Sequence, residues 1–102
     1  MKFEYETLEI GYTIPESKHK YTPDFILPNG IIVEAKGKWD YASRKKMLLV
    51  IAQNPHLDIR MLFMRASNKI RKGSPTSYAD FCEKNNIKWA QGPEVPKEWL
   101  KK

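Results

Sequence analysis

Two apolar runs, at residues 22–27 and 31–36, lie on either side of a short turn sequence, Pro28-Asn29-Gly30. The runs contain β-branched and aromatic residues, as is typical of strands joined in a β-hairpin. A three-residue loop suits the turn best, because Pro and Asn fill the centre of a type I turn and Gly takes the left-handed bulge position. The pattern therefore predicts a hairpin in which Leu27 faces Ile31 across the loop.

The register of this hairpin decides which side chains share a face. With a three-residue loop, Asp24 pairs with Glu34, and the alternation of side chains places both of them and Lys36 on one face. A two-residue turn at Asn29-Gly30 would instead put Asp24 and Glu34 on opposite faces. We prefer the three-residue loop, which leaves the other face wholly apolar and in the core. That face comprises Phe25, Leu27, Ile31, Val33 and Ala35.

Two carboxylates side by side in a sheet repel one another, and partial desolvation raises the cost of charging both. A hard divalent cation relieves the repulsion, and carboxylate, carbonyl and water oxygens suit Mg²⁺, with Mn²⁺ as a substitute. Lys36, two residues beyond Glu34, can then point at a water or phosphate bound to the metal. The alternative is a solvated salt-bridge patch. Ile26 and Ile32 lie on the same face as the two acids, so this face is not fully solvated.

Hydrophobic periodicity predicts further elements around the hairpin. We expect one helix to begin at Asp40 or Ser43 and end at Gln53, and a second to be capped by Ser74 or Thr76. The apolar side of the first helix is expected to cover the sheet with Ala42, Met47, Leu48, Val50 and Ile51. The other expected elements are strands within 3–6 and 8–14, a polar loop at 15–20, a central strand at 59–64 parallel to a hairpin strand, an edge strand at 87–90 and a helical turn at 96–100.

The composition is that of one domain, residues 1–102, with a basic surface. Basic residues number 18 against 12 acidic ones, and the net charge of +6 favours a polyanionic partner such as DNA. The single cysteine, Cys82, excludes an intramolecular disulfide and indicates a reducing compartment. No apolar run reaches membrane length and the charged start is unlike a signal peptide, so we expect a cytoplasmic protein with no membrane partner.

Basic side chains cluster in four places where they could contact DNA phosphates. These are the polar loop, the segment after the hairpin, the first half of the first helix and the connection after the central strand. A solvated surface is the alternative interpretation, because phosphate contacts have no sequence signature of their own. The candidate DNA-binding residues are Lys18, His19, Lys20, Lys38, Arg44, Lys45, Lys46, Lys69, Arg71 and Lys72.

Several segments resemble a known family. Pro23-Asp24, followed after nine residues by Glu34-Ala35-Lys36, is similar to the PD-(D/E)XK nuclease signature. Further segments resemble the endonuclease I family of T-seven-like phages, which resolve Holliday junctions, over nearly the whole chain. They are residues 2–6, 21–25, 27–31, 44–46, 57–60, 72–78 and 81–84.

This resemblance implies a restriction-endonuclease-like α/β core, in which helices flank a mixed central β-sheet. It implies that Asp24, Glu34 and the Ala35 carbonyl hold Mg²⁺, and that Lys36 assists the attacking hydroxide or steadies the phosphate. The expected activity is metal-dependent hydrolysis of DNA phosphodiesters, selective for Holliday junctions or other branched or nicked duplexes. A phage enzyme of this kind would act in the host cytoplasm during DNA recombination.

The chain departs from the family pattern at its N-terminus. In the family, a further catalytic Glu lies on a helix before the segment matched by residues 2–6, and two subunits exchange this helix. The missing acid leaves the second metal and the exchanged dimer open. A separately encoded N-terminal fragment could supply the helix, and a homodimer is the other partner that we consider. Glu4 and Glu6 are candidates to replace the acid, or they form the exposed side of a strand. Two alternatives stay open: a site-specific nicking endonuclease of the homing type on the same core, and a non-cleaving DNA-binding module.

Overall fold

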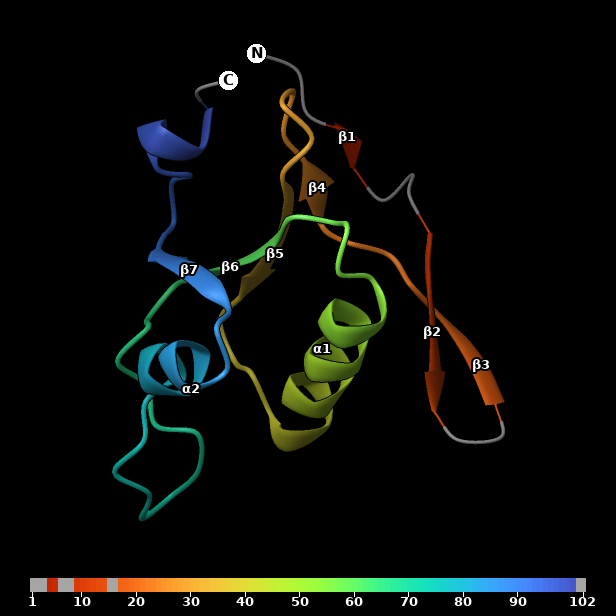
Figure 1. Ribbon diagram of the computed structural model, residues 1–102. Helices are drawn as coiled ribbons and strands as arrows, with labels where there is room; N and C mark the ends of the chain where they lie inside the picture. The colour runs from red at the N-terminus through yellow and green to blue at the C-terminus, as the bar shows by residue number, and fades with distance from the viewer. Residues whose placement is uncertain (1–3, 6–8, 15–16, 101–102) are drawn as a thin grey trace.

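The computed structural model describes residues 4–5, 9–14 and 17–100 of the chain. In the described residues, five strands come before the first α-helix, one strand lies between the two α-helices, and a last strand and a short 3₁₀ helix follow (Figure 1). In order they are β1 (Glu4–Tyr5), β2 (Ile10–Ile14), β3 (Ser17–Tyr21), β4 (Phe25–Ile26), β5 (Ile32–Lys36), α1 (Tyr41–Gln53), β6 (Ile59–Phe63), α2 (Tyr78–Lys84), β7 (Lys88–Gln91) and η1 (Lys97–Leu100).

The central sheet is mixed, as expected, and has the strand order β1-β4-β5-β6-β7. The β1–β4 and β4–β5 pairs are antiparallel, whereas β5, β6 and β7 run parallel. The buried strand β6 is therefore central and parallel to a hairpin strand, as its continuous apolar sequence predicts. Strands β2 and β3 form a separate two-stranded ribbon that lies beside α1 (Figure 1).

The hairpin has the three-residue loop predicted from the turn sequence. Phe25 pairs with Val33, and the Leu27 N–H donates to the Ile31 carbonyl at 2.8 Å. Gly30 has a φ of +92°, the left-handed conformation that the bulge position requires. The expected register, on which the pairing of the acidic residues depends, is confirmed.

Both faces of the sheet are covered. The residues of β5 and β6 that face the two helices form one core cluster, in which Met47 and Val50 of α1 and Cys82 of α2 take part. The predicted apolar face of the hairpin forms a second cluster on the other side, where Leu27 and Trp99 are buried. Among the described residues, no helix is long and apolar enough to cross a membrane.

The first helix has the expected boundaries, but its buried side differs from the prediction. Asp40 is the N-cap, and its side chain accepts a hydrogen bond from the Ser43 N–H at 2.8 Å. Ala42 is exposed, and Arg44 is buried instead. The expectation for Ala42 was wrong because the interior next to it provides backbone carbonyls, which a guanidinium satisfies and a methyl group does not.

Two other expectations need correction. Most of the segment expected to be a loop is strand β3, in which Lys20 pairs with Gly11 of β2. A strand partner can override a polar, basic composition, because it satisfies the backbone whatever the side chains are. The second helix begins later than expected, after Ser77, which forms a capping box with Asp80.

Candidate metal and phosphate site

Glu34 lies in the middle of β5 with only 6% of its surface exposed. Its Oε1 accepts a hydrogen bond from the hydroxyl of Tyr21, at the end of β3, at a distance of 2.7 Å. Its Oε2 lies 3.4 Å from the ammonium nitrogen of Lys36, two residues further along the same strand. The buried carboxylate is thus held between a neutral donor and a cation.

Asp24 precedes β4 and lies against the edge of β5. Its Oδ2 accepts a hydrogen bond from the backbone N–H of Ala35 at 2.8 Å. Because the N–H and C=O of one strand residue point to the same edge, the Ala35 carbonyl is directed to the side on which Asp24 lies. Asp24 comes directly before the Phe25–Val33 pair, so its backbone is opposite that of Glu34.

The two carboxyl groups share one electrostatic environment. Burial raises the pKa of Glu34, and the nearby charge of Asp24 raises it further, whereas the Tyr21 hydrogen bond and Lys36 oppose the rise. Burial, together with the charge of Glu34, also raises the pKa of Tyr21. The hydroxyl therefore stays a donor across the physiological pH range. A further positive charge at this edge would favour the ionised form of Glu34.

The donor atoms fit a hard divalent cation. Within the described part of the chain, no three Asp, Glu, His or Cys side chains come together as a metal site. Two carboxylates and a backbone carbonyl remain, which is the sparse oxygen set that Mg²⁺ accepts when it keeps several of its waters. These residues therefore fit Mg²⁺ or Mn²⁺ better than zinc, whose sites are built mainly on His nitrogen and Cys sulfur ligands.

The structure places Lys46, a candidate DNA-binding residue, beside this edge. The ammonium nitrogen of Lys46, on α1, lies 5.4 Å from the centre of the Tyr21 ring, next to the acids. Lys20 is exposed and forms an ion pair with Glu9 at 3.0 Å. The side chains of Lys18 and His19 lie outside the described part of the structure. The remaining candidates, other than Arg44, are exposed: Lys38, Lys45, Lys69, Arg71 and Lys72.

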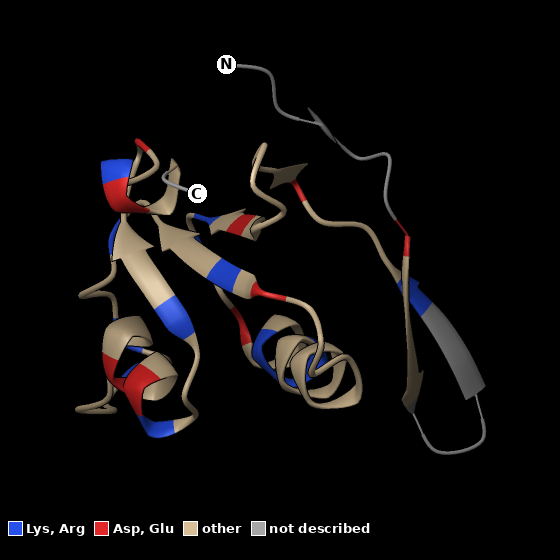
Figure 2. Ribbon diagram, turned by 45° about the horizontal axis from the view of Figure 1, so that its top comes forward, with Lys and Arg blue, Asp and Glu red and all other residues tan. Residues whose placement is uncertain are grey.

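Arg44 contradicts its expected role in DNA binding. Figure 2 shows Lys and Arg grouped along α1, but the side chain of Arg44 points inward and is 5% exposed. Its guanidinium donates to the carbonyl oxygens of Trp39, at 2.6 Å, and Ile70, at 3.0 Å. These contacts join α1 to the connection after β6, so the guanidinium is not available to a phosphate.

Sequence reasoning missed Tyr21 as a partner of Glu34. The residue belongs to the segment that carries the family resemblance, but nothing in a single sequence shows that its hydroxyl reaches an acid 13 positions away. The only sequence signal is its place three residues before Asp24 in a motif that also contains an acid. Its role becomes visible only in the fold, where the end of β3 brings the Tyr21 hydroxyl to Glu34 of β5.

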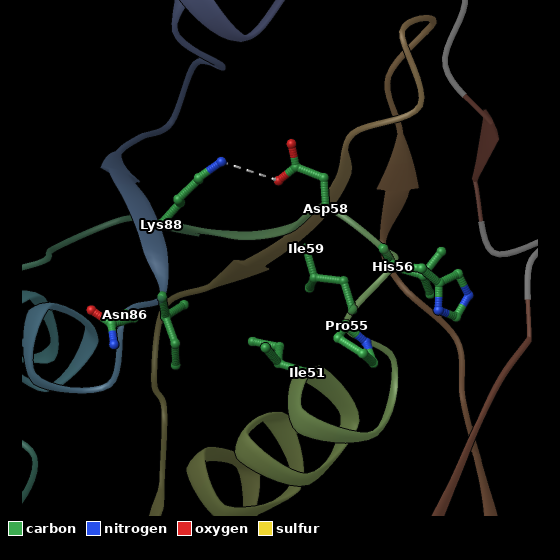
Figure 3. A pocket seen from close by; sticks show the side chains of 9 residues that line it. Ile51, Pro55, His56, Asp58, Ile59, Asn86 and Lys88 are labelled. Atoms are coloured by element: carbon green, nitrogen blue, oxygen red, sulfur yellow. Dashed lines mark ion pairs between the residues drawn. The ribbon is translucent and has the colours of Figure 1, made fainter.

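A separate pocket lies at the start of β6 and the end of α1 (Figure 3). Ile51 and Ile59 contribute apolar walls, and Lys88 and Asp58 form an ion pair at 4.0 Å beside it. Asp58 also pairs with Arg60 at 2.8 Å, so its charge is compensated without a ligand. The pocket contains none of the paired acids and belongs to a different region of the sheet.

Comparison with known proteins adds to this geometry. The model of the phage endonuclease I family matches residues 1–102. The chain is similar to Endonuclease I of Escherichia phage T7, with 55% identity over 101 residues, covering 99% of this chain and 67% of that protein. It is also similar to Endodeoxyribonuclease 1 of Enterobacteria phage T3, with 57% identity over 90 residues, covering 88% and 59%. The chain spans less than two thirds of this second relative's length.

Proposed function

This chain belongs to the phage endonuclease I family, and we propose that it is a magnesium-dependent endodeoxyribonuclease that hydrolyses phosphodiester bonds in branched DNA. The single observation that carries the proposal is the juxtaposition of Asp24 and Glu34 at one edge of β5, with Lys36 3.4 Å from Glu34. A protein that only binds DNA has no physical need for clustered acids on a basic surface. The names of the two relatives support DNA as the substrate.

Asp24, Glu34 and the Ala35 carbonyl would hold Mg²⁺, or Mn²⁺ in its place. Bound there, the cation would lower the pKa of a water and offset the charge that develops on the phosphorus. Different groups orient the two carboxylates. The backbone N–H of Ala35 binds Asp24, and the hydroxyl of Tyr21 binds Glu34. Both carboxylates are thus held in place before a cation binds.

Lys36 would act on the phosphate side of the reaction. Its side chain is 30% exposed, so its ammonium group is open to a bound phosphodiester while it stays close to Glu34. A positioned cation can orient the attacking water or stabilise the equatorial oxygens of the phosphoryl group. By the family resemblance, in-line attack by water would form the new P–O bond as the P–O3′ bond breaks, and the released 3′-oxygen would take up a proton, leaving a 5′-phosphate and a 3′-hydroxyl.

Selectivity for branched DNA would come from an assembly rather than from one site. A four-way junction presents two equivalent scissile strands, and two sites held at a fixed spacing match that symmetry. We therefore include a homodimer, or a pairing with an N-terminal fragment, in the proposal. Exposed cations such as Lys45 and Arg71 would hold the flanking phosphates without reading sequence.

Cleavage assays test this function. A supercoiled plasmid and a synthetic four-way junction are incubated with Mg²⁺, Mn²⁺ or EDTA. We expect cleavage in either metal, none in EDTA, and at least a 100-fold loss in Glu34→Ala and Lys36→Gln, because one removes a ligand and the other a positioned cation. Lys84→Gln is the matched control, since it removes the same charge from an exposed position on α2 outside the candidate site, and should retain most of the activity.

A second candidate function rests on the small number of acids. The described residues place only two carboxylates at the site, so a third acid could come from another chain before cleavage occurs. In that case the protein alone binds DNA without cutting it. Tight, salt-sensitive binding with no cleavage of plasmid or junction in any metal would contradict the first proposal and support this one.

A further inference from the structure

Tyr21 links two parts of the fold that are separate in the sheet topology. It ends β3, which belongs to the two-stranded ribbon, and its hydroxyl donates to Glu34 of the central sheet at 2.7 Å. The residue is 2% exposed, so no competing water replaces this hydrogen bond from the solvent side. A hydrogen bond from a buried donor to a carboxylate is more stabilising than the same bond at the surface.

The ribbon that carries Tyr21 is itself fastened to α1. The side-chain amide of Gln53 accepts from the Thr13 N–H and donates to the Thr13 carbonyl, at 2.6 Å for the second bond. It therefore pairs with β2 as a neighbouring strand would. Asn54 adds a hydrogen bond to the Gly11 carbonyl at 3.0 Å. These contacts hold the ribbon at the C-terminal end of the helix.

Lys46 fixes the aromatic side of the same arrangement. Its ammonium nitrogen lies 5.4 Å from the ring centre of Tyr21 and 5.9 Å from that of Tyr12, which is within the range of cation–π attraction. The Tyr21 ring is thus held on its face by α1 while its hydroxyl is bound by β5. The ring has little freedom to turn away from Glu34.

These contacts distinguish the two oxygens of Glu34. The hydroxyl of Tyr21 binds Oε1, and Lys36 approaches Oε2. A neutral hydroxyl orients a carboxylate without cancelling its charge, so the carboxylate keeps its attraction for a cation. Groups that hydrogen-bond to metal ligands commonly set the ligand's orientation, and their loss weakens metal affinity or activity by about 10- to 100-fold.

We propose that Tyr21 is a positioning residue for the metal site: its hydroxyl holds the Glu34 carboxylate in the orientation that binds a divalent cation, and thereby couples the β2–β3 ribbon to that site. The inference rests on the proposed function, because it assumes that Glu34 ligates the cation. Tyr21 touches neither the cation nor the DNA in this account. It acts through Glu34 alone.

Metal affinity without DNA tests the proposal directly. Mn²⁺ binding to the full chain is measured by electron paramagnetic resonance for the wild type, Tyr21→Phe and Tyr78→Phe. The control removes the hydroxyl of another buried tyrosine, which accepts a hydrogen bond from the backbone N–H of Trp39 at 3.0 Å. In the described part of the chain, this hydroxyl forms no hydrogen bond with Asp24 or Glu34. We expect the Mn²⁺ Kd to rise about 10-fold in Tyr21→Phe and by less than about 2-fold in Tyr78→Phe.

Kinetics and a second variant extend the test. In Tyr21→Phe, kcat should fall at low Mn²⁺ and recover in part at high Mn²⁺, while DNA affinity in EDTA stays at the wild-type value. Gln53→Ala loosens the ribbon without touching Tyr21, and should weaken Mn²⁺ binding in the same direction, by a smaller factor. This variant also keeps the proposal testable if Tyr21→Phe does not fold.

The outcomes separate the two levels of inference. Unchanged Mn²⁺ affinity in a folded Tyr21→Phe, or in Gln53→Ala if Tyr21→Phe does not fold, would overturn the positioning role and leave the nuclease proposal standing. A wild-type protein that neither binds Mn²⁺ nor cleaves DNA would overturn the proposed function, and the role of Tyr21 with it. An equal loss of affinity in Tyr21→Phe and Tyr78→Phe would show a general packing effect and also overturn the positioning role.

Discussion

At the scale of single residues, Glu34 lies in the proposed metal site, and the burial of its charge lowers the stability of the metal-free fold. Its carboxylate is 6% exposed, and burial is the largest cause of its raised pKa. A folded state that binds a proton more tightly than the unfolded state loses stability as the pH rises past the unfolded-state pKa. The ionised form of Glu34 therefore favours a nearby cation, and without one it lowers the stability of the folded protein.

Removing this charge should stabilise the metal-free protein. In EDTA at pH 7 we expect Glu34→Gln to raise Tm by a few degrees, since about 1 kcal/mol corresponds to about 4 °C or more in a domain of this size. The gain should disappear below about pH 4, where the wild-type carboxyl is protonated in both states. Calorimetry measures Tm at pH 7 and below about pH 4. The control Glu94→Gln, at an exposed position, should leave Tm unchanged at both pH values.

The same variant should respond differently to metal. Mn²⁺ should raise the Tm of the wild type, because a ligand that binds only the folded state stabilises it, and should leave Glu34→Gln nearly unchanged. A lower Tm for Glu34→Gln than for the wild type in EDTA would contradict the account of Glu34 as a destabilising buried charge.

At the scale of elements, the hairpin loop decides whether the acids meet. Gly30 occupies the left-handed position at φ +92°, and the Leu27–Ile31 hydrogen bond closes the loop around it. Because side chains alternate along a strand, a shift of one residue would move Asp24 to the opposite face from Glu34. The local conformation of one glycine is therefore linked to the chemistry at the other end of the hairpin.

Gly30→Ala should cost about 1–2 kcal/mol of unfolding free energy, because an L side chain is strained in the left-handed region. Gly37→Ala is the control, since that position has no positive φ and no atom within 4 Å of an added Cβ. It should stay within about 0.5 kcal/mol of the wild type or stabilise slightly. Urea denaturation measures both, and a Gly30→Ala variant as stable as Gly37→Ala would contradict the loop assignment.

At the scale of the whole molecule, the net charge is +6, but not every basic residue is free to contact DNA. Arg44 is used to hold the fold together, and Lys20 is paired with Glu9. Lys45 and Arg71 are exposed and line one groove between α1 and the connection after β6. Neither forms an ion pair with any described residue. Both are therefore available to exchange solvent ions for phosphates.

The salt dependence of DNA binding should show whether Lys45 and Arg71 contact phosphates. We expect Lys45→Gln combined with Arg71→Gln to reduce the slope of log K against log salt by about 2, because each phosphate contact contributes about 0.9. Lys88→Gln with Lys97→Gln, on β7 and η1, removes the same charge and should change the slope by less than half as much. Fluorescence anisotropy in EDTA separates the two, and equal slopes would show that the whole basic surface contributes.

The sequence by itself determined the hairpin, the extent of the first helix and the pairing of the acids. Turn chemistry at Pro28-Asn29-Gly30 and the alternation around it were sufficient for the hairpin, and with it for Asp24 and Glu34 on one edge. These features depend on residues a few positions apart, whose backbone preferences a single sequence displays. The helix that ends at Gln53 was predicted for the same reason.

Only the tertiary structure decided which polar groups find partners inside the fold. The inward turn of Arg44 depends on the backbone carbonyl of Ile70, which the connection after β6 brings close. The hydroxyl of Tyr21 reaches Glu34 because the ribbon is fastened to α1 through Gln53. Such contacts join residues far apart in the chain, and satisfying buried polar groups selects them. No local periodicity records them.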